Sequence, residues 1–258
     1  MLTLTGVNKS FSGRRVLDGV TLDIAAGESV ALLGANGSGK TTTLRCIVGL
    51  ARPDSGRILV GGIDAAHDPI GARQRMSYLP QRSIFPGTLS VRETLGVVAK
   101  LRSAGADAVD RELAACDLSP LADRNVVQLS GGERQRLAMA VAFLPAVDLY
   151  LFDEASANLD PAALRILFRR ARELNRDGRT LLFTTHMPAD VRRLATRAIV
   201  LRDGRVESDG AGAFELRRYE RLLERDLWGD DDDAAIRDGG GCDGVAVDVR
   251  LRRGGAVA

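Results

Sequence analysis

Residues 34–41 have the composition and spacing needed to hold a polyphosphate. They read GANGSGKT, which matches the pattern GxxxxGK followed by Ser or Thr. Glycines let consecutive backbone N–H groups turn towards phosphate oxygens, and a helix expected over about 40–50 directs its positive end at the same anion. Lys40 would add charge at the β- and γ-phosphates, and the Thr41 hydroxyl would ligate Mg²⁺. The predicted phosphate-binding residues are Gly34, Ala35, Asn36, Gly37, Ser38, Gly39, Lys40, Thr41 and Thr42.

Two adjacent acids, Asp153 and Glu154, follow the apolar run LYLF at residues 149–152. A carboxylate at Asp153 could hold Mg²⁺, and one at Glu154 could orient and deprotonate a water in line with the γ-phosphate. Two acids at a buried strand end are costly unless a cation lies nearby, which favours this interpretation over a solvated acidic turn.

Gln81 and His186 also follow short apolar runs. The amide of Gln81 could ligate Mg²⁺ or hold the water without adding charge. His186 is predicted to contact the γ-phosphate, although a purely structural histidine is the alternative. The predicted catalytic residues are Glu154, His186, Gln81 and Lys40, and the predicted metal ligands are Thr41, Gln81 and Asp153.

The elements that must position these residues are short strands alternating with helices. Apolar runs at 29–33, 76–79, 149–152, 180–183 and 198–201 are typical of strands buried on both faces. Alternation with helical patterns predicts an α/β fold with a doubly wound parallel sheet. Ligands of such sheets bind outside the carboxyl ends of the strands, where Gln81, Asp153, Glu154 and His186 are expected to meet.

Three other regions differ from this pattern. Residues about 1–30 and 56–64 alternate apolar and polar types around glycines, which predicts a small antiparallel β-layer. Residues about 82–145 are expected to form an inserted helical lobe. Residues 227–258 are acidic and glycine-rich, so we expect a domain over 1–226 followed by a poorly ordered tail.

A second glycine motif, LSGGERQR, occupies residues 129–136. Ser130 and Glu133 have the spacing of a capping box, and two glycines expose the N–H groups at the helix start. The residues Ser130, Gly131 and Gly132 are therefore predicted to form a second anion site.

Composition limits the function classes. The chain has 258 residues and a net charge of +2, which gives no electrostatic footprint for nucleic acid. Its three cysteines are widely spaced, so neither a disulfide framework nor a zinc site is expected. We find no secretory signal and no run near the roughly 18 apolar residues of a membrane span.

Taken together, these motifs resemble the ATPase subunits of ABC transporters over about residues 2–210. The resemblance implies a P-loop NTPase with a RecA-like sheet, an antiparallel β-subdomain and an inserted α-helical subdomain. It implies that ATP and Mg²⁺ are the ligands, and that each ATP lies between Lys40 of one subunit and residues 130–132 of another. Phe11 matches the aromatic that stacks on adenine, Val16 would lie near the ribose, and Asp160 ends the segment at 157–160 called the D-loop. Gln81 matches the Q-loop glutamine and His186 the switch histidine.

The same resemblance implies partners and a location. We expect a homodimer or heterodimer, a separate transmembrane subunit, no nucleic acid, and a cytoplasmic position, peripheral on the membrane. Ile84 and Phe85 follow Gln81 closely and are candidates for a docking patch or, alternatively, for the core of the helical lobe. The segment TLSVRETLGVVAKLR at 88–102 favours export. The alternative function is an ABC-type ATPase that drives or regulates a membrane complex without moving solute.

Overall fold

A six-stranded sheet in the order β10-β9-β3-β8-β7-β6 forms the centre of the computed structural model, which describes residues 1–157 and 159–228. Its strands are β3 (Ser29–Leu33), β6 (Met76–Leu79), β7 (Leu149–Asp153), β8 (Thr180–Thr184), β9 (Arg197–Arg202) and β10 (Arg205–Ala211). All neighbours pair in parallel except β10, which runs antiparallel beside β9. β3, β7 and β8 are buried at every position, because the sheet is covered on both faces.

The register of the sheet brings several strand ends together. Leu79 pairs with Phe152, Asp153 pairs with Thr184, and Leu32 pairs with Thr184. The carboxyl ends of β6, β7, β8 and β3 therefore share one edge of the sheet, as the sequence predicts.

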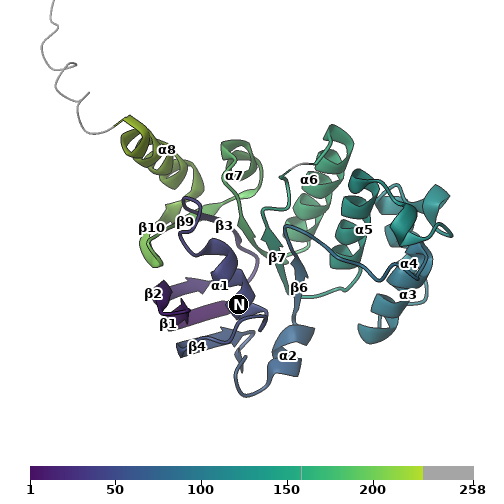
Figure 1. Cartoon of the computed structure of the whole chain (residues 1–258), viewed down its shortest axis with the longest axis horizontal. Coiled ribbons are helices and arrows are strands. Elements are labelled where there is room, and N and C mark those ends of the chain that lie inside the picture. Colours follow the sequence, from purple (N-terminus) through teal and green to yellow (C-terminus); the bar gives the residue numbers. More distant parts are fainter. Residues whose placement is uncertain (158, 229–258) are drawn as a thin grey trace, which may run out of the picture. The chain divides into compact units, whose positions relative to one another are not determined.

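Helices pack around this sheet (Figure 1). They are α1 (Lys40–Ile47), α2 (Pro69–Gln74), α5 (Gly131–Phe143), α6 (Pro161–Arg176), α7 (Pro188–Leu194) and α8 (Gly212–Trp228). Helix α6 begins at Pro161, and the side chain of Asp160 caps it by accepting a 2.8 Å hydrogen bond from the Ala163 N–H. Leu167 and Ala171 lie on its buried face, which matches the helical spacing of the apolar residues.

A smaller antiparallel sheet carries the amino terminus. Its order is β2-β1-β4-β5, from β1 (Leu2–Phe11), β2 (Arg14–Ile24), β4 (Ser55–Val60) and β5 (Ile63–Asp64). Its inward side chains share one apolar core with α1 and the central sheet; members of this core include Leu2, Leu4, Leu17, Leu44, Ile47, Leu149 and Leu182. This common core fixes β1 and β2 beside the start of α1.

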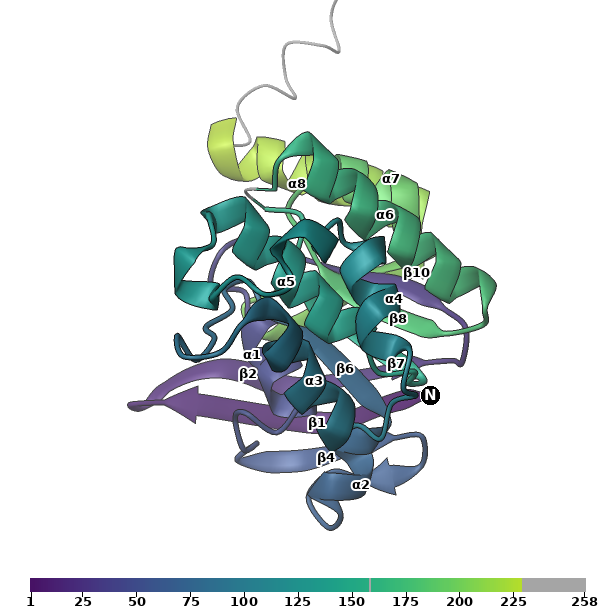
Figure 2. The ribbon, with the colours of Figure 1, turned by 90° about the vertical axis from the view of Figure 1, so that its right-hand side faces the viewer.

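The inserted helical lobe contains α3 (Val91–Leu101), α4 (Ala108–Ala115) and two short 3-10 helices, η1 (Ser119–Leu121) and η2 (Val126–Gln128). Figure 2 shows α3 and α4 side by side at the end of the molecule that faces the viewer. A buried ion pair joins the lobe to the core, because Arg170 of α6 lies 2.6 Å from the Glu112 carboxylate of α4.

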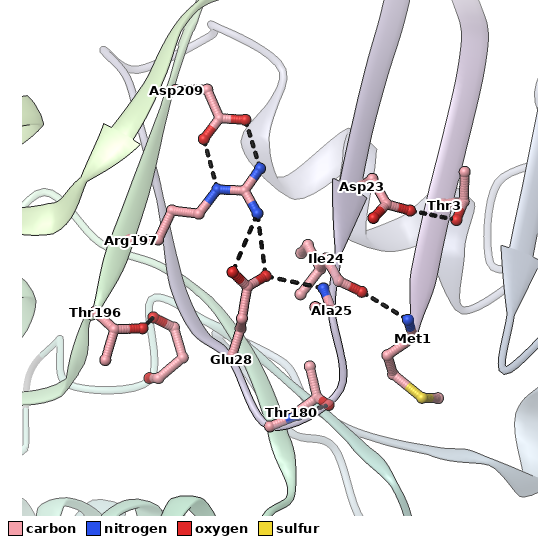
Figure 3. Close-up of polar contacts among 12 residues, drawn as sticks. Met1, Thr3, Asp23, Ile24, Ala25, Glu28, Thr180, Thr196, Arg197 and Asp209 are labelled. Atoms are coloured by element: carbon pink, nitrogen blue, oxygen red, sulfur yellow. Dashed lines mark hydrogen bonds and ion pairs between the residues drawn. The ribbon is translucent and has the colours of Figure 1, made fainter.

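Arg197, at the start of β9, connects three segments (Figure 3). Its guanidinium donates two 2.6 Å hydrogen bonds to Asp209 of β10 and lies 3.0 Å from Glu28, just before β3. Glu28 also accepts a 2.8 Å hydrogen bond from the Ala25 N–H. This fork-like pairing holds the edge hairpin β9–β10 against the segment that leads from the small sheet into β3.

The predicted fold class is confirmed: a parallel sheet flanked by helices, a small antiparallel sheet and an inserted helical lobe. Strand β10 and helix α8 are additions that the sequence does not indicate. The first compact unit covers Met1–Arg221, while the boundary near residue 226 stays a prediction. The expected tail begins at residue 227, but helix α8 continues through Trp228. The remainder of the tail, from residue 229, and Asn158 lie outside the residues that the structure describes.

Candidate functional site

The phosphate loop lies between β3 and α1 and depends on its glycines. Gly34, Gly37 and Gly39 adopt positive φ values of 154°, 82° and 108°. A Cβ at Gly34 would lie 2.3 Å from the Leu201 carbonyl oxygen, and a Cβ at Gly39 would lie 2.7 Å from the Leu17 side chain. The loop can take this path only because these positions lack side chains.

Lys40 is buried and lies over the loop it follows. Its Nζ donates hydrogen bonds to the carbonyl oxygens of Gly34 at 2.7 Å and Ala35 at 3.1 Å. Burial lowers the pKa of Lys40, and the nearby carboxylates of Glu154 and Asp153 oppose that shift. The lysine charge therefore faces the same two acids that the sequence places at this edge.

Asp153 is the most enclosed acid of the site, with 1% of its surface exposed. Its Oδ1 accepts hydrogen bonds from the hydroxyls of Thr41 at 3.0 Å and Thr184 at 2.8 Å. The Tyr78 hydroxyl donates to Oδ2 at 3.2 Å, and burial raises the pKa of that tyrosine. The first turn of α1 and the strands β6 and β8 thus hold one carboxylate in place.

A divalent cation fits this donor set. Thr41 and Asp153 offer a hydroxyl and a carboxylate oxygen, and Mg²⁺ in phosphate sites commonly takes one or two protein ligands and completes its shell with phosphate and water. Within residues 1–157 and 159–221, no three His, Cys, Asp or Glu side chains form a metal-binding group. The arrangement matches a cation held jointly with a nucleotide rather than a protein-only metal cage.

Glu154 has side-chain partners that differ from those of Asp153. Its φ is +47°, and its N–H donates to the Thr184 hydroxyl at 2.9 Å. Its Oε2 accepts a 3.0 Å hydrogen bond from the Gln81 amide and lies 3.7 Å from His186 Nδ1. The structure therefore joins Gln81, Glu154 and His186 in one cluster, in which His186 is half-exposed.

The second glycine motif begins α5. Ser130 caps the helix, with a 3.3 Å hydrogen bond from the Glu133 N–H to Ser130 Oγ and a 2.7 Å hydrogen bond from the Ser130 N–H to the Glu133 carboxylate. A Cβ at Gly132 would lie 3.2 Å from Asp160 Oδ2, so the starts of α5 and α6 are adjacent. Among the described residues of the chain, no hydrogen bond or ion pair joins this second group to Lys40, Asp153 or Glu154.

Phe11 and Val16 lie on the antiparallel sheet. The Phe11 ring is 47% exposed, and Lys9 Nζ lies 5.1 Å from its centroid. The carbonyl oxygen of Val16 would lie 3.0 Å from a Cβ at Gly39, so the start of β2 lies against the phosphate loop. An exposed aromatic ring such as that of Phe11 is what base stacking requires.

Several residues of this site are not singled out by the sequence motifs. Tyr78 and Thr184 hold Asp153, and Tyr219 of α8 is buried, with 5% of its surface exposed. Burial raises the pKa of Tyr219, and the charge of Glu154 adds to this shift. Tyr78 and Thr184 occur in the strands whose ends carry the predicted residues, so the strand pattern could have indicated them. Tyr219 lies far from every motif in the sequence, and no pattern indicates it.

The fold and this site define a P-loop nucleotide-binding protein. Comparison with known proteins gives the family, because the model described as ABC transporter matches residues 17–157. A Nod factor export ATP-binding protein I from Burkholderia orbicola is 35% identical over 237 residues, which cover 90% of this chain and 77% of the relative. The chain belongs to the ABC transporter family, as an ATP-binding ATPase subunit.

Solved structures agree with this assignment. An ATP-binding subunit of an ABC transporter has a TM-score of 0.80 and 28% identity, with 88% of this chain and 98% of that chain covered. A dimeric ATP-binding cassette in a post-hydrolysis state with ADP and Pi has a TM-score of 0.75 and 27% identity, with 82% and 98% covered. A bacterial Atm1-family ABC exporter with ATP bound has a TM-score of 0.77 and 27% identity; the match covers 87% of this chain but 41% of the exporter chain.

Across the part of the chain that the structure describes, no helix combines the length and apolar character that crossing a bilayer requires.

Proposed function

We propose that this chain is the Mg²⁺-dependent ATP-hydrolysing subunit of a membrane export system, peripheral on the cytoplasmic face. The observation that carries the proposal is the shared sheet edge, where Thr41 and Asp153 are 3.0 Å apart and Glu154 contacts Gln81 and His186. The Burkholderia relative is a Nod factor export ATP-binding protein, which supports export as the direction of transport.

Each site residue has a separate role in this proposal. The loop glycines and Lys40 bind the phosphates, while Thr41 and Asp153 hold Mg²⁺, which when bound neutralises charge on the β- and γ-phosphates. Glu154 accepts a proton from the attacking water. Gln81 and His186 orient Glu154 through their contacts of 3.0 Å and 3.7 Å with its Oε2. Phe11 stacks on the adenine.

We further propose a head-to-tail dimer. The N-terminus of α5 carries a second set of exposed backbone donors at Gly131 and Gly132, beside Asp160. No hydrogen bond among the described residues ties this set to the phosphate loop of its own chain, which suits a role towards the nucleotide of a partner. The dimeric cassette among the similar structures supports this arrangement.

The transmembrane partner is proposed to dock in a groove beside Gln81. The groove has a volume of about 480 Å³ and is lined by residues that include Gln81, Ile84, Arg134, Ala138, Ala157 and Leu159. Ile84 is 94% exposed, whereas Phe85 is half-buried. An exposed isoleucine at the rim of a groove is a favourable contact for an apolar segment.

Affinity purification of the tagged chain from its own membranes tests the proposal. We expect phosphate release that requires both ATP and Mg²⁺, and a polytopic membrane protein that copurifies. Hydrolysis without Mg²⁺ dependence would contradict the metal assignment. Copurification with a membrane complex that moves no solute in vesicles would instead identify a mechanical or regulatory motor.

A further inference from the structure

Asp190 is a buried acid that has no place in the mechanism above. It lies in the first turn of α7 and is 5% exposed. Its Oδ2 accepts hydrogen bonds from the Ser156 hydroxyl at 2.5 Å and from the Thr185 hydroxyl at 2.6 Å. Both hydroxyls therefore donate to the same carboxylate oxygen.

The two hydroxyls come from the two segments that carry Glu154 and His186. Ser156 lies two residues after Glu154, and Thr185 immediately precedes His186. Asp190 is therefore a bridge between the segment after β7 and the segment after β8. It contacts neither of them directly.

The turn that carries His186 depends on this bridge. Thr185 Oγ1 also accepts a 2.9 Å hydrogen bond from the Met187 N–H, so the threonine side chain spans His186. The His186 side chain is 51% exposed, and the polar contact that its imidazole makes among the described residues is with Glu154, at 3.7 Å. Little except the turn itself fixes the position of the imidazole.

The environment of Asp190 makes its two hydrogen bonds necessary. Apolar residues line the small cavity beside it; they include Phe152, Leu167, Phe183 and Leu194. A carboxylate placed against such a wall is costly unless hydrogen bonds satisfy it. The Ser156 and Thr185 hydroxyls supply these hydrogen bonds, and the same bonds fix the orientation of the two side chains.

We propose that Asp190 is a positioning residue for hydrolysis, which clamps the segment after Glu154 to the turn of His186 and so maintains the spacing between those two side chains. The inference rests on the proposed roles of Glu154 and His186. The nucleotide is bound elsewhere, by residues 34–42, so the clamp should affect turnover and leave ATP binding intact.

Steady-state ATPase kinetics of Asp190→Ala test the clamp. We expect kcat to fall by about 10- to 100-fold with the KM for ATP within about twofold of the parent, because a misplaced base reduces turnover without removing a nucleotide contact. Asp190→Asn should be intermediate, since it keeps the shape and loses the charge. An unchanged kcat in Asp190→Ala would overturn the proposal.

A double-mutant cycle separates positioning from a general loss of structure. In a His186→Ala background, Asp190→Ala should reduce kcat further by less than about threefold, because its effect passes through the lost imidazole. Full additivity of the two losses would contradict the clamp.

Glu215 provides a matched control. It is also a buried acid that accepts a 2.5 Å hydrogen bond from a serine, Ser208, but it lies on α8. Glu215→Ala should lower the melting temperature comparably and leave kcat within about twofold. If Glu215→Ala lowers kcat as much as Asp190→Ala does, the effect is one of stability and the proposal fails.

If Asp190→Ala does not fold, variants of the two residues that donate hydrogen bonds to Asp190 can still test the clamp. Thr185→Val and Ser156→Ala each remove one arm and should lower kcat, while Thr185→Ser keeps the hydroxyl and should restore it. A parent protein with no ATPase activity would refute the proposed function itself. An active parent with active Thr185→Val and Ser156→Ala variants would refute only the clamp.

Discussion

The hydroxyl of Thr41 donates a 3.0 Å hydrogen bond to Asp153 Oδ1, across 112 positions of the sequence. This contact joins the first turn of α1 to the last residue of β7. When Mg²⁺ is present, both oxygens should bind it in place of their mutual hydrogen bond, because Mg²⁺ binds hydroxyl and carboxylate oxygens at close to 2.1 Å. The pair therefore marks where magnesium is expected to enter the site.

Replacing Asp153 by Asn should separate nucleotide binding from metal use. The amide keeps the shape of the side chain but loses the charge that attracts Mg²⁺. We expect ATPase activity to fall by at least about 100-fold, while ATP binding in EDTA changes little. Phosphate release against Mg²⁺ concentration and binding of a fluorescent ATP analogue measure the two effects. Parental Mg²⁺ dependence in this variant would remove Asp153 from the metal site.

Glu154→Gln should retain ATP and stop turnover. The amide cannot accept the proton of the attacking water, but the phosphate loop and Lys40 are untouched. We expect the variant to accumulate as an ATP-bound dimer on size-exclusion chromatography, with hydrolysis nearly abolished. Turnover at the parental rate would show that another group is the base.

Lys40→Ala should abolish tight ATP binding. The change removes a buried positive charge that faces Asp153 and Glu154 and would contact the phosphates. Equilibrium binding should weaken by about 100-fold or more, with Lys40→Arg only partly restoring it because a guanidinium does not match the compact ammonium. An unchanged affinity for ATP would contradict the phosphate cradle.

Ile84→Asp should weaken membrane association and leave basal ATPase activity near the parental level. Ile84 is 94% exposed at the proposed docking groove, so a charge there would have to be desolvated against an apolar partner. Phe85→Asp is less informative, because the half-buried ring also contributes to packing. Leu50→Asp is the matched control, since Leu50 is 70% exposed outside that groove. Equal losses in Ile84→Asp and Leu50→Asp would remove the docking assignment.

Arg170→Met should destabilise the fold in a pH-dependent way. Burial raises the pKa of Glu112 above its ordinary 4.5, and the Arg170 charge opposes that shift. Without Arg170 the folded-state pKa of Glu112 should rise further. The stability of the variant should then be retained below about pH 4.5, where Glu112 is protonated in both the folded and the unfolded state. It should be lost as the pH rises through the raised folded-state pKa of Glu112.

The expected loss at pH 8 is about 3–5 kcal/mol, because an unpaired buried carboxylate remains. At pH 5 the loss should be clearly smaller, since Glu112 can take up a proton. Urea unfolding at both pH values gives the comparison. Arg172→Met, at an exposed position of the same helix, should cost under about 1 kcal/mol at either pH. A pH-independent loss in Arg170→Met would contradict the buried-pair explanation.

The sequence predicts the phosphate loop and the strand ends well because each rests on a local pattern. Glycine spacing defines residues 34–41, and short apolar runs that end in polar residues place Gln81, Asp153 and His186 at one edge. The contacts of Tyr78 and Thr184 with Asp153 could not be predicted in this way. They depend on which strands are neighbours and on their register, and a single sequence gives neither.

The solvent exposure of individual side chains and strands is harder to predict from the sequence. Ile84 and Phe85 look alike as adjacent apolar residues, but tertiary packing leaves one exposed and the other half-buried. Strand β10 was missed because its sequence, RVESDGA, is mostly polar, as suits an edge strand with one side exposed. Asp190 carries no motif that a spacing rule would select.

The positive φ of Glu154 means that the carboxylate proposed as the base is attached at a point of backbone strain. A side chain in this left-handed conformation costs about 1–2 kcal/mol relative to glycine. Selection for heat resistance alone would therefore favour Glu154→Gly, a change that relieves the backbone strain and removes the proposed base. Thermal stability and turnover therefore place opposite demands on this position. Directed evolution for thermal stability, without selection for transport, should replace Glu154 early.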